Sequence, residues 1–172
     1  SSAENIPDAL HACNCIKVES SNQLIGYNTD WIGFEKSLVP LLQPHHKKAL
    51  VLGSGGAAAA VIYALDRLKI DYIIVSRQNQ PGSMIYEELD ESLMSENHLI
   101  INTTPLGMYP LTEQCPAIPY RFITPHHLLY DLVYNPAQTV FLKKGKERGA
   151  TVKNGEEMLI LQAEESWKIW NS

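Results

Sequence analysis

Short apolar segments alternate with helical patterns along most of the chain. Continuous apolar runs predict buried strands, at residues 49–52, 71–75, 98–102 and 128–133. Helical patterns separate or follow them, at residues 56–68, 84–94, 138–148 and 156–170, and a short strand is predicted at 150–153. Strands that are apolar on both faces and alternate with helices indicate an α/β fold, with a doubly wound and mostly parallel sheet.

The first forty residues have a different pattern. Two apolar runs at residues 15–19 and 24–27 flank a polar turn and predict a β-hairpin. Thr29 and Asp30 are good capping residues for a helix that ends near Pro40. We therefore expect a domain boundary near the start of this helix, and further along the chain a long proline-rich loop at residues 104–125.

Composition excludes several classes of function. Fourteen Lys and Arg against nineteen Asp and Glu give a net charge of -5, so no basic surface for nucleic acid or anionic membranes is expected. The long uncharged stretch at residues 49–65 is interrupted by glycines and is shorter than the ~20 residues of a membrane span. Three unpatterned cysteines favour a reducing, cytoplasmic compartment. The histidine pairs at 45–46 and 126–127 have no ligand partner at metal-binding spacing, so we expect loop histidines and no metal.

A glycine motif gives the sharpest chemical signal. Gly53, Gly55 and Ala58 fit G-x-G-x-x-[GA] between a predicted strand and a predicted helix. Gly53 permits a tight turn, and Gly55 has no side chain to keep a pyrophosphate from the N–H groups of the helix N-terminus. The motif predicts a dinucleotide-binding turn; the alternative is a glycine-rich turn that binds nothing.

The end of the second strand indicates which dinucleotide is bound. NAD-binding units usually place an Asp or Glu there to hold the ribose 2′-hydroxyl, whereas this chain has Ser76 and Arg77. No carboxylate repels a 2′-phosphate, and the guanidinium and hydroxyl groups can bind one. NADP is therefore favoured over NAD. The alternative is an ordinary exposed arginine, since no second cation follows at residues 78–81.

Together with further segments, these motifs resemble the shikimate dehydrogenase family over about residues 9–170. The matching segments occur in the family's order: ACNC at 12–15, GYNTDWIG at 26–33, GSGGA at 53–57, SR at 76–77, INTTPLGM at 101–108, YDLVYNP at 130–136, TVFL at 139–142 and NGEEMLILQA at 154–163. The resemblance implies NADP-dependent hydride transfer between 3-dehydroshikimate and shikimate, in aromatic amino-acid biosynthesis. It implies that residues 1–29 are the trailing part of a substrate domain and residues 30–172 a Rossmann-like NADP-binding domain.

The resemblance also implies roles for individual residues. Asp30 matches the aspartate of the family's catalytic Lys-Asp pair, which handles the proton that accompanies the hydride. Substrate binding is expected at Asn14, Asp30, Tyr134 and Gln162. Cofactor binding is expected at Gly53, Ser54, Gly55, Gly56, Ala57, Ser76, Arg77, Thr104, Met108, Leu132, Gly155 and Met158.

The chain also departs from the family pattern. The family's catalytic Lys and Ser-rich carboxylate motif lie upstream of the Asn14 position, and no lysine here matches, so this chain is expected to bind cofactor without turning over. The family's Gly-Leu-Gly-Met is replaced by GEEM at residues 155–158, and we expect both glutamates to point to solvent. Alternatives are an NAD-dependent quinate or shikimate dehydrogenase and a non-catalytic module that senses a dinucleotide or shikimate. The oligomeric state is open, with a homodimer as one option.

Overall fold

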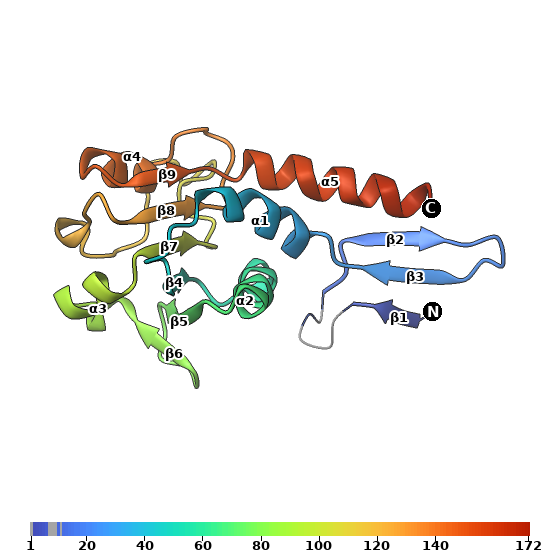
Figure 1. The fold of residues 1–172 in the computed structure, drawn as a ribbon, viewed down its shortest axis with the longest axis horizontal. Coiled ribbons are helices and arrows are strands. Elements are labelled where there is room, and N and C mark those ends of the chain that lie inside the picture. Colours follow the sequence, from blue (N-terminus) through green and yellow to red (C-terminus); the bar gives the residue numbers. More distant parts are fainter. Residues whose placement is uncertain (1, 7–9, 11) are drawn as a thin grey trace.

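A six-stranded parallel sheet forms the centre of the molecule (Figure 1). The computed structural model describes residues 2–6, 10 and 12–172. The strands of this sheet are β4 (Lys48–Leu52), β5 (Asp71–Ser76), β6 (Ser83–Ile85), β7 (Leu99–Asn102), β8 (Leu128–Asp131) and β9 (Thr151–Lys153). Their spatial order is β6-β5-β4-β7-β8-β9, which is the 3-2-1-4-5-6 order of doubly wound dinucleotide-binding sheets. The predicted fold class is confirmed.

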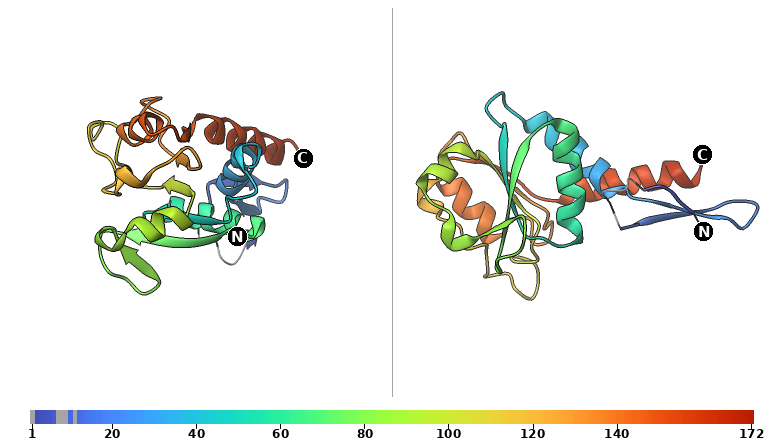
Figure 2. Two further views of the ribbon diagram at one scale, coloured as in Figure 1. Left: turned by 60° about the vertical axis from the view of Figure 1, so that its left-hand side comes forward. Right: turned by 90° about the horizontal axis from the view of Figure 1, so that it is seen from below.

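Helices cover both faces of the sheet (Figure 2). One face carries α1 (Asp30–Leu38), α2 (Gly56–Leu68) and α5 (Glu156–Trp170), and the other carries α3 (Glu91–Glu96) and α4 (Val140–Glu147). Side chains alternate along each central strand. Ala49 and Val51 of β4 face the α2 side, and Leu50 and Leu52 face the α4 side. Both sets are buried, which explains why the strands read as continuous apolar runs.

A second, three-stranded sheet lies beside the C-terminal half of α5 (Figure 1). The predicted hairpin is confirmed as β2 (Cys15–Val18) and β3 (Leu24–Tyr27), which pair antiparallel. A strand that was not predicted, β1 (Ser2–Asn5), pairs parallel with β3. The Trp170 indole N–H donates to the Ile16 carbonyl (3.0 Å), which ties the hairpin to α5. The division of the chain at residue 30 coincides with the start of α1 and stays a prediction.

The prediction of a helix at residues 84–94 is wrong. The structure forms β6, a 3-10 turn η2 (Tyr86–Glu88) and then the short α3. Two acidic side chains split the segment: the Glu88 carboxylate accepts from the Ile85 N–H (2.8 Å), and the Asp90 carboxylate accepts from the Leu93 N–H (2.9 Å) and caps α3. The other predicted helices and strands differ from the structure only at their ends. The long loop contains one more 3-10 turn, η3 (Tyr120–Phe122), and another, η1 (Val39–Leu41), follows α1.

No helix within the described residues is long and apolar enough to cross a membrane.

Five histidines gather beside the amino ends of β4, β7 and β8. They are His45, His46, His98, His126 and His127, with ring centroids 4.3 to 6.2 Å apart. The sequence predicted loop histidines and not their grouping. Within residues 2–6, 10 and 12–172, no group of three or more His, Cys, Asp and Glu side chains is arranged to hold a metal ion. Burial is the main cause that lowers the pKa of three of these imidazoles, those of His46, His98 and His127.

This cluster predicts acid sensitivity of the fold. A histidine whose pKa is lower in the folded state than in the unfolded state favours folding above its unfolded pKa, and this contribution is lost as the pH falls. We expect the free energy of unfolding to fall between about pH 7 and about pH 5, and His127→Asn to flatten that slope. Urea denaturation across this range measures it, with His126→Asn, an exposed member of the cluster, as the control. Equal slopes for His127→Asn and the unmodified chain would contradict the prediction.

Candidate active site

The turn after β4 requires glycine at Gly53. Its φ of +111° lies in the left-handed region, and a Cβ at this position would lie 2.6 Å from Thr103 Oγ1. That hydroxyl donates to the Leu52 carbonyl (2.8 Å), so it is held where the Cβ would clash. The lack of a side chain at Gly53 therefore allows the segments that follow β4 and β7 to lie close together.

Gly55 is a different kind of glycine. Its φ is -87°, which any residue adopts. Apart from chain neighbours and the backbone of α2 itself, no described atom lies within 4 Å of a Cβ at Gly55 or Gly56. Packing among the described residues therefore gives no reason for either glycine. Their effect is to leave open the first turn of α2, where unpaired backbone N–H groups and the helix dipole favour an anion.

A cavity of about 350 Å³, which we call the Arg77 cavity, lies beside this turn. Arg77, at the end of β5, lines it, is exposed and forms no ion pair with any residue of the described part of the chain. Ser76 lines it too, but its hydroxyl bonds to the Gln78 carbonyl and lies 3.2 Å from Ser83 Oγ. The Ser76 hydroxyl is therefore already engaged within the turn, which leaves Arg77 as the better anion ligand of the two.

Tyr86 lines the same cavity and was missed from the sequence, because its segment was predicted to be helical. Burial raises the pKa of its phenol to about 12, while Arg77 acts in the opposite direction. The remaining residues that line this cavity are Gly53, Ser54, Gly55, Thr103, Thr104, Pro105, Leu106, Leu111 and Gln114.

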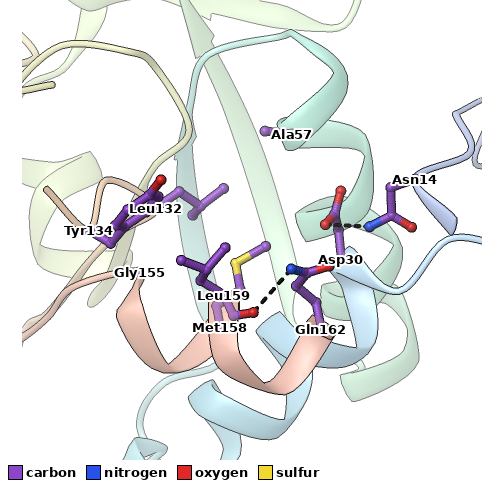
Figure 3. A pocket seen from close by; sticks show the side chains of 9 residues that line it. All are labelled: Asn14, Asp30, Ala57, Leu132, Tyr134, Gly155, Met158, Leu159 and Gln162. Atoms are coloured by element: carbon purple, nitrogen blue, oxygen red, sulfur yellow. Dashed lines mark hydrogen bonds between the residues drawn. The ribbon is translucent and has the colours of Figure 1, made fainter. Parts of the chain in front are cut away.

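A second cavity, of about 390 Å³, lies between α1, α5 and the carboxyl end of β8, and we call it the Asp30 cavity (Figure 3). It brings together all four residues expected to bind substrate, with some of those expected to bind cofactor. Its lining residues are Asn14, Asp30, Ala57, Leu132, Tyr134, Gly155, Met158, Leu159 and Gln162. Met158 and Gln162 are one turn apart on α5, which places both at the cavity, and Leu159 is an addition to the predicted set.

A hydrogen bond from Asn14, drawn in Figure 3, orients Asp30 at this cavity and belongs to a larger network. Asn14 Nδ2 donates to Asp30 Oδ1 (2.7 Å), and Asn14 Oδ1 accepts from the Thr29 N–H (2.8 Å). The Thr29 side chain makes no capping bond to α1, contrary to its predicted role, and its Oγ1 lies 3.0 Å from Ser166 Oγ of α5. Burial raises the pKa of the Asp30 carboxyl above its usual value, and the bond from Asn14 opposes that shift. The Asn14 amide thus fixes the orientation of a partly buried carboxyl at the cavity.

A third cavity, of about 240 Å³, adjoins the other two through shared lining residues. Thr104 lines both it and the Arg77 cavity, and Leu132 and Tyr134 line both it and the Asp30 cavity. Met108 lines the third cavity and neither of the other two. Of the predicted site residues, Gly56 lines none of the three cavities. The predicted glutamate orientation at the start of α5 is confirmed, since Glu156 and Glu157 are both exposed.

Helices α1 and α5 cross closely beneath the Asp30 cavity. A Cβ at Gly33 of α1 would lie 2.6 Å from the Met158 carbonyl oxygen and 3.0 Å from Gln162 Cβ. Only a glycine lets the two helices approach this far. The crossing holds Asp30, one turn before Gly33, beside the α5 residues that line the cavity.

The fold and the cavities define a class of protein: a doubly wound α/β domain of the dinucleotide-binding type, with cavities at the carboxyl edge of its sheet. No family model matches the chain. The chain is 37% identical to the NADP(+) shikimate dehydrogenase of Desulforamulus reducens and 39% identical to that of Methanococcus maripaludis, over 94% and 95% of its residues. Among solved structures, shikimate dehydrogenase from Aquifex aeolicus has a TM-score of 0.82 at 36% identity, over 95% of this chain and 62% of that one.

The structure of shikimate 5-dehydrogenase from Thermus thermophilus, solved with NADP(H) and shikimate, has a TM-score of 0.81 at 30% identity. It is matched over 94% of this chain and 63% of that one. The chain is homologous to the shikimate dehydrogenases over nearly all its residues. It spans 62% of the Desulforamulus relative and 63% of the Methanococcus relative.

We expect Gly33→Ala to destabilise the protein and to disturb the Asp30 cavity. The added methyl group forces α1 and α5 apart, which costs roughly 1–3 kcal/mol in a close-packed contact. Chemical denaturation measures the loss. Gly56→Ala is the matched control, because its methyl group meets open space at the start of α2. Equal stability of Gly33→Ala and Gly56→Ala would show that the crossing tolerates a side chain.

Proposed function

We propose that this chain binds NADP and is the cofactor-binding part, with the trailing end of the substrate domain, of an NADP-dependent shikimate dehydrogenase. That enzyme transfers a hydride between 3-dehydroshikimate and shikimate. The observation that carries the proposal is the pair of glycines at the start of α2, Gly55 and Gly56, which no described neighbour requires. The relatives support it, since those quoted above are named NADP(+) shikimate dehydrogenases.

The three adjoining cavities fit the parts of a dinucleotide. The open N-terminus of α2 would hold the pyrophosphate, and Arg77 at the end of β5 would hold the 2′-phosphate by a charge-assisted, bidentate contact. Thr104, Met108, Leu132, Gly155 and Met158 would surround the nicotinamide, which supplies the hydride. Because Leu132 lines two of the cavities, and Gly155 and Met158 line the Asp30 cavity, the nicotinamide would lie where the third cavity meets the Asp30 cavity.

The polar residues of the Asp30 cavity fit a ring that carries several hydroxyl groups. Asn14 and Gln162 offer amide donors and acceptors, and Tyr134 a phenol, at the rim of one cavity. Asp30 would take up or release the proton at the reacting hydroxyl while its bond from Asn14 keeps the carboxyl oriented. Among the described residues no lysine lines this cavity, so the family's Lys-Asp pair would be completed by another part of the whole enzyme.

We further infer that the protein acts in the cytoplasm, where three unpaired cysteines stay reduced. We also propose that it forms a homodimer, with the exposed apolar side chains of the hairpin and α5 as its contact. These are Ile16, Val18, Trp167 and Trp170.

Calorimetric titration of this chain with NADPH and NADH tests the cofactor proposal. We expect tighter binding of NADPH, and in Arg77→Ala a loss of about tenfold or more for NADPH that brings it to the level of NADH. Arg121→Ala, an exposed arginine that lines none of the three cavities, is the matched control. Preference for NADH would favour the quinate-type alternative, and binding of neither would contradict the cofactor proposal for this chain.

In the whole enzyme, Asp30→Asn is expected to lower turnover by about 10² to 10⁴, because general acid and base assistance is lost. The affinity for NADPH should stay unchanged, since Asp30 lies outside the Arg77 cavity. Steady-state rates of shikimate-dependent NADPH formation measure the effect. An unchanged rate would leave Asp30 only the role of first residue of α1.

A further inference from the structure

Two polar residues, Asp131 and Asn102, are buried and line none of the three cavities. Asp131 is the last residue of β8, and Asn102 is the last residue of β7. The two residues are register partners in the parallel sheet, and neither side chain is exposed to solvent. The sequence placed both residues in motifs but assigned neither of them a role.

Asp131 accepts three hydrogen bonds. Asn102 Nδ2 donates to its Oδ1 (2.9 Å), the Val133 N–H donates to the same oxygen (3.1 Å), and Thr139 Oγ1 donates to its Oδ2 (2.5 Å). Thr139 is the capping residue of α4. The carboxylate therefore joins β7, β8 and the start of α4 at one point.

From Asn102 the hydrogen bonds continue into the segment Thr103–Leu106. Asn102 Oδ1 accepts from the Thr104 N–H (3.0 Å) and from Thr104 Oγ1 (2.6 Å). Thr104 Oγ1 in turn accepts from the Leu106 N–H (3.3 Å). Asn102 Nδ2, which donates to Asp131, also donates to the Leu106 carbonyl (3.3 Å). The Asn102 amide therefore joins the Asp131 carboxylate to both ends of the segment Thr104–Leu106 through one network of hydrogen bonds.

The segment at the far end of this chain is part of the cofactor site proposed above. Thr103, Thr104 and Pro105 line both the Arg77 cavity and the adjoining third cavity, and Leu106 lines the Arg77 cavity. The Thr103 hydroxyl is also the group that a side chain at position 53 would clash with. The Asn102 amide bonds directly to Thr104 and Leu106 of this segment, so its orientation bears on the shape of the site.

We propose that Asp131 is a positioning residue for the cofactor: through Asn102 it holds the segment Thr103–Leu106 in the shape that lines the dinucleotide cavities. The proposal rests on the proposed function. An ionised carboxylate only accepts hydrogen bonds, so it permits a single orientation of the Asn102 amide, with the oxygen toward Thr104. A neutral amide at position 131 is a weaker acceptor than a carboxylate, so the Asn102 NH₂ group would be held less firmly, and with it the bonds from Asn102 to Thr104 and Leu106.

Burial opposes the charge at Asp131. It raises the pKa of the carboxyl to about 6, even though the bonds from Thr139, Val133 and Asn102 lower it. The ionised form is thus costly for the fold above about pH 6, and a neutral residue would suit packing better. A charge kept at such a cost favours a role beyond stability.

The other ionisable groups around Asp131 do not supply this pH dependence. Tyr120 of η3 interacts electrostatically with Asp131, but burial raises the pKa of its phenol, so it stays neutral in weak acid. Cys115 is hydrogen bonded to Tyr120, and the ammonium group of Lys144, on α4, lies 4.6 Å from the Tyr120 ring centroid. Both act on Asp131 at most through Tyr120.

Asp131→Asn tests the proposal. At about pH 7.5 we expect its affinity for NADPH to be about tenfold weaker, while its stability is no lower because a buried charge has been removed. The ratio of the two dissociation constants should approach one as the pH falls through about 6, where the unmodified carboxyl also becomes neutral. The titration of the cofactor's own phosphates cancels in this ratio.

Thr139→Val is the matched control. It removes the bond between Asp131 and α4 and leaves the bond to Asn102 in place. We expect lower stability with little change in NADPH affinity. If Asp131→Asn behaves in the same way as Thr139→Val, with stability lost and affinity kept, Asp131 is only structural and the proposal is overturned.

Hydrogen exchange separates this proposal from the proposed function, because it needs no cofactor. The Thr104 and Leu106 amides should exchange about tenfold faster in Asp131→Asn than in the unmodified chain at about pH 7.5. If the chain does not bind NADPH, faster exchange still supports the positioning role, and equal exchange overturns it. If the variant does not fold, the same exchange is measured on the unmodified chain at several pH values. After correction for intrinsic exchange, the protection of these two amides should decrease as the pH is lowered past about 6, where Asp131 becomes neutral. Constant protection would overturn the proposal.

Discussion

The close approach of the chains that leave β4 and β7 is the constraint on which the rest of the site depends. The two strands are neighbours in the sheet, yet one chain continues into α2 and the other into the loop after Asn102. Thr103 donates twice to the Leu52 carbonyl, through its N–H (2.9 Å) and its hydroxyl (2.8 Å), and this fixes the turn at Gly53. Diverging connections leave a crevice at the carboxyl edge, and all three cavities open along it.

The sequence predicted what depends on neighbouring residues in the chain. The bounds of α2 and α5 follow from helical spacing after a glycine motif and after Gly155, and the buried strands from short apolar runs. The Asp30 cavity was predicted as a set of residues from motif resemblance, and the structure brings that set together. Spacing alone predicted one detail of it, the common face of Met158 and Gln162 on α5.

What the sequence did not predict depends on contacts between distant segments. The residues at 84–94 have helix-compatible composition, but pairing of β6 with β5 and the caps from Glu88 and Asp90 outweigh that propensity. Tyr86 reaches the Arg77 cavity only because of this change. The histidine cluster likewise exists because β4, β7 and β8 are neighbours in the sheet, so that separate loops meet at its amino edge. No local pattern encodes that order.

Asp30 and Asp131 show how access to a cavity separates two carboxylates with the same direction of pKa shift. Burial raises the pKa of both, and each accepts a bond from an asparagine amide, Asn14 or Asn102. Asp30 lines a cavity of about 390 Å³, so its carboxyl is open to whatever occupies that cavity. Asp131 has no exposed surface and its oxygens are occupied by protein donors, so its charge acts only on the shape of the chain around it. The first arrangement suits the proton transfer proposed for Asp30, and the second suits the positioning role proposed for Asp131, because a buried acceptor fixes the direction of every donor that points to it.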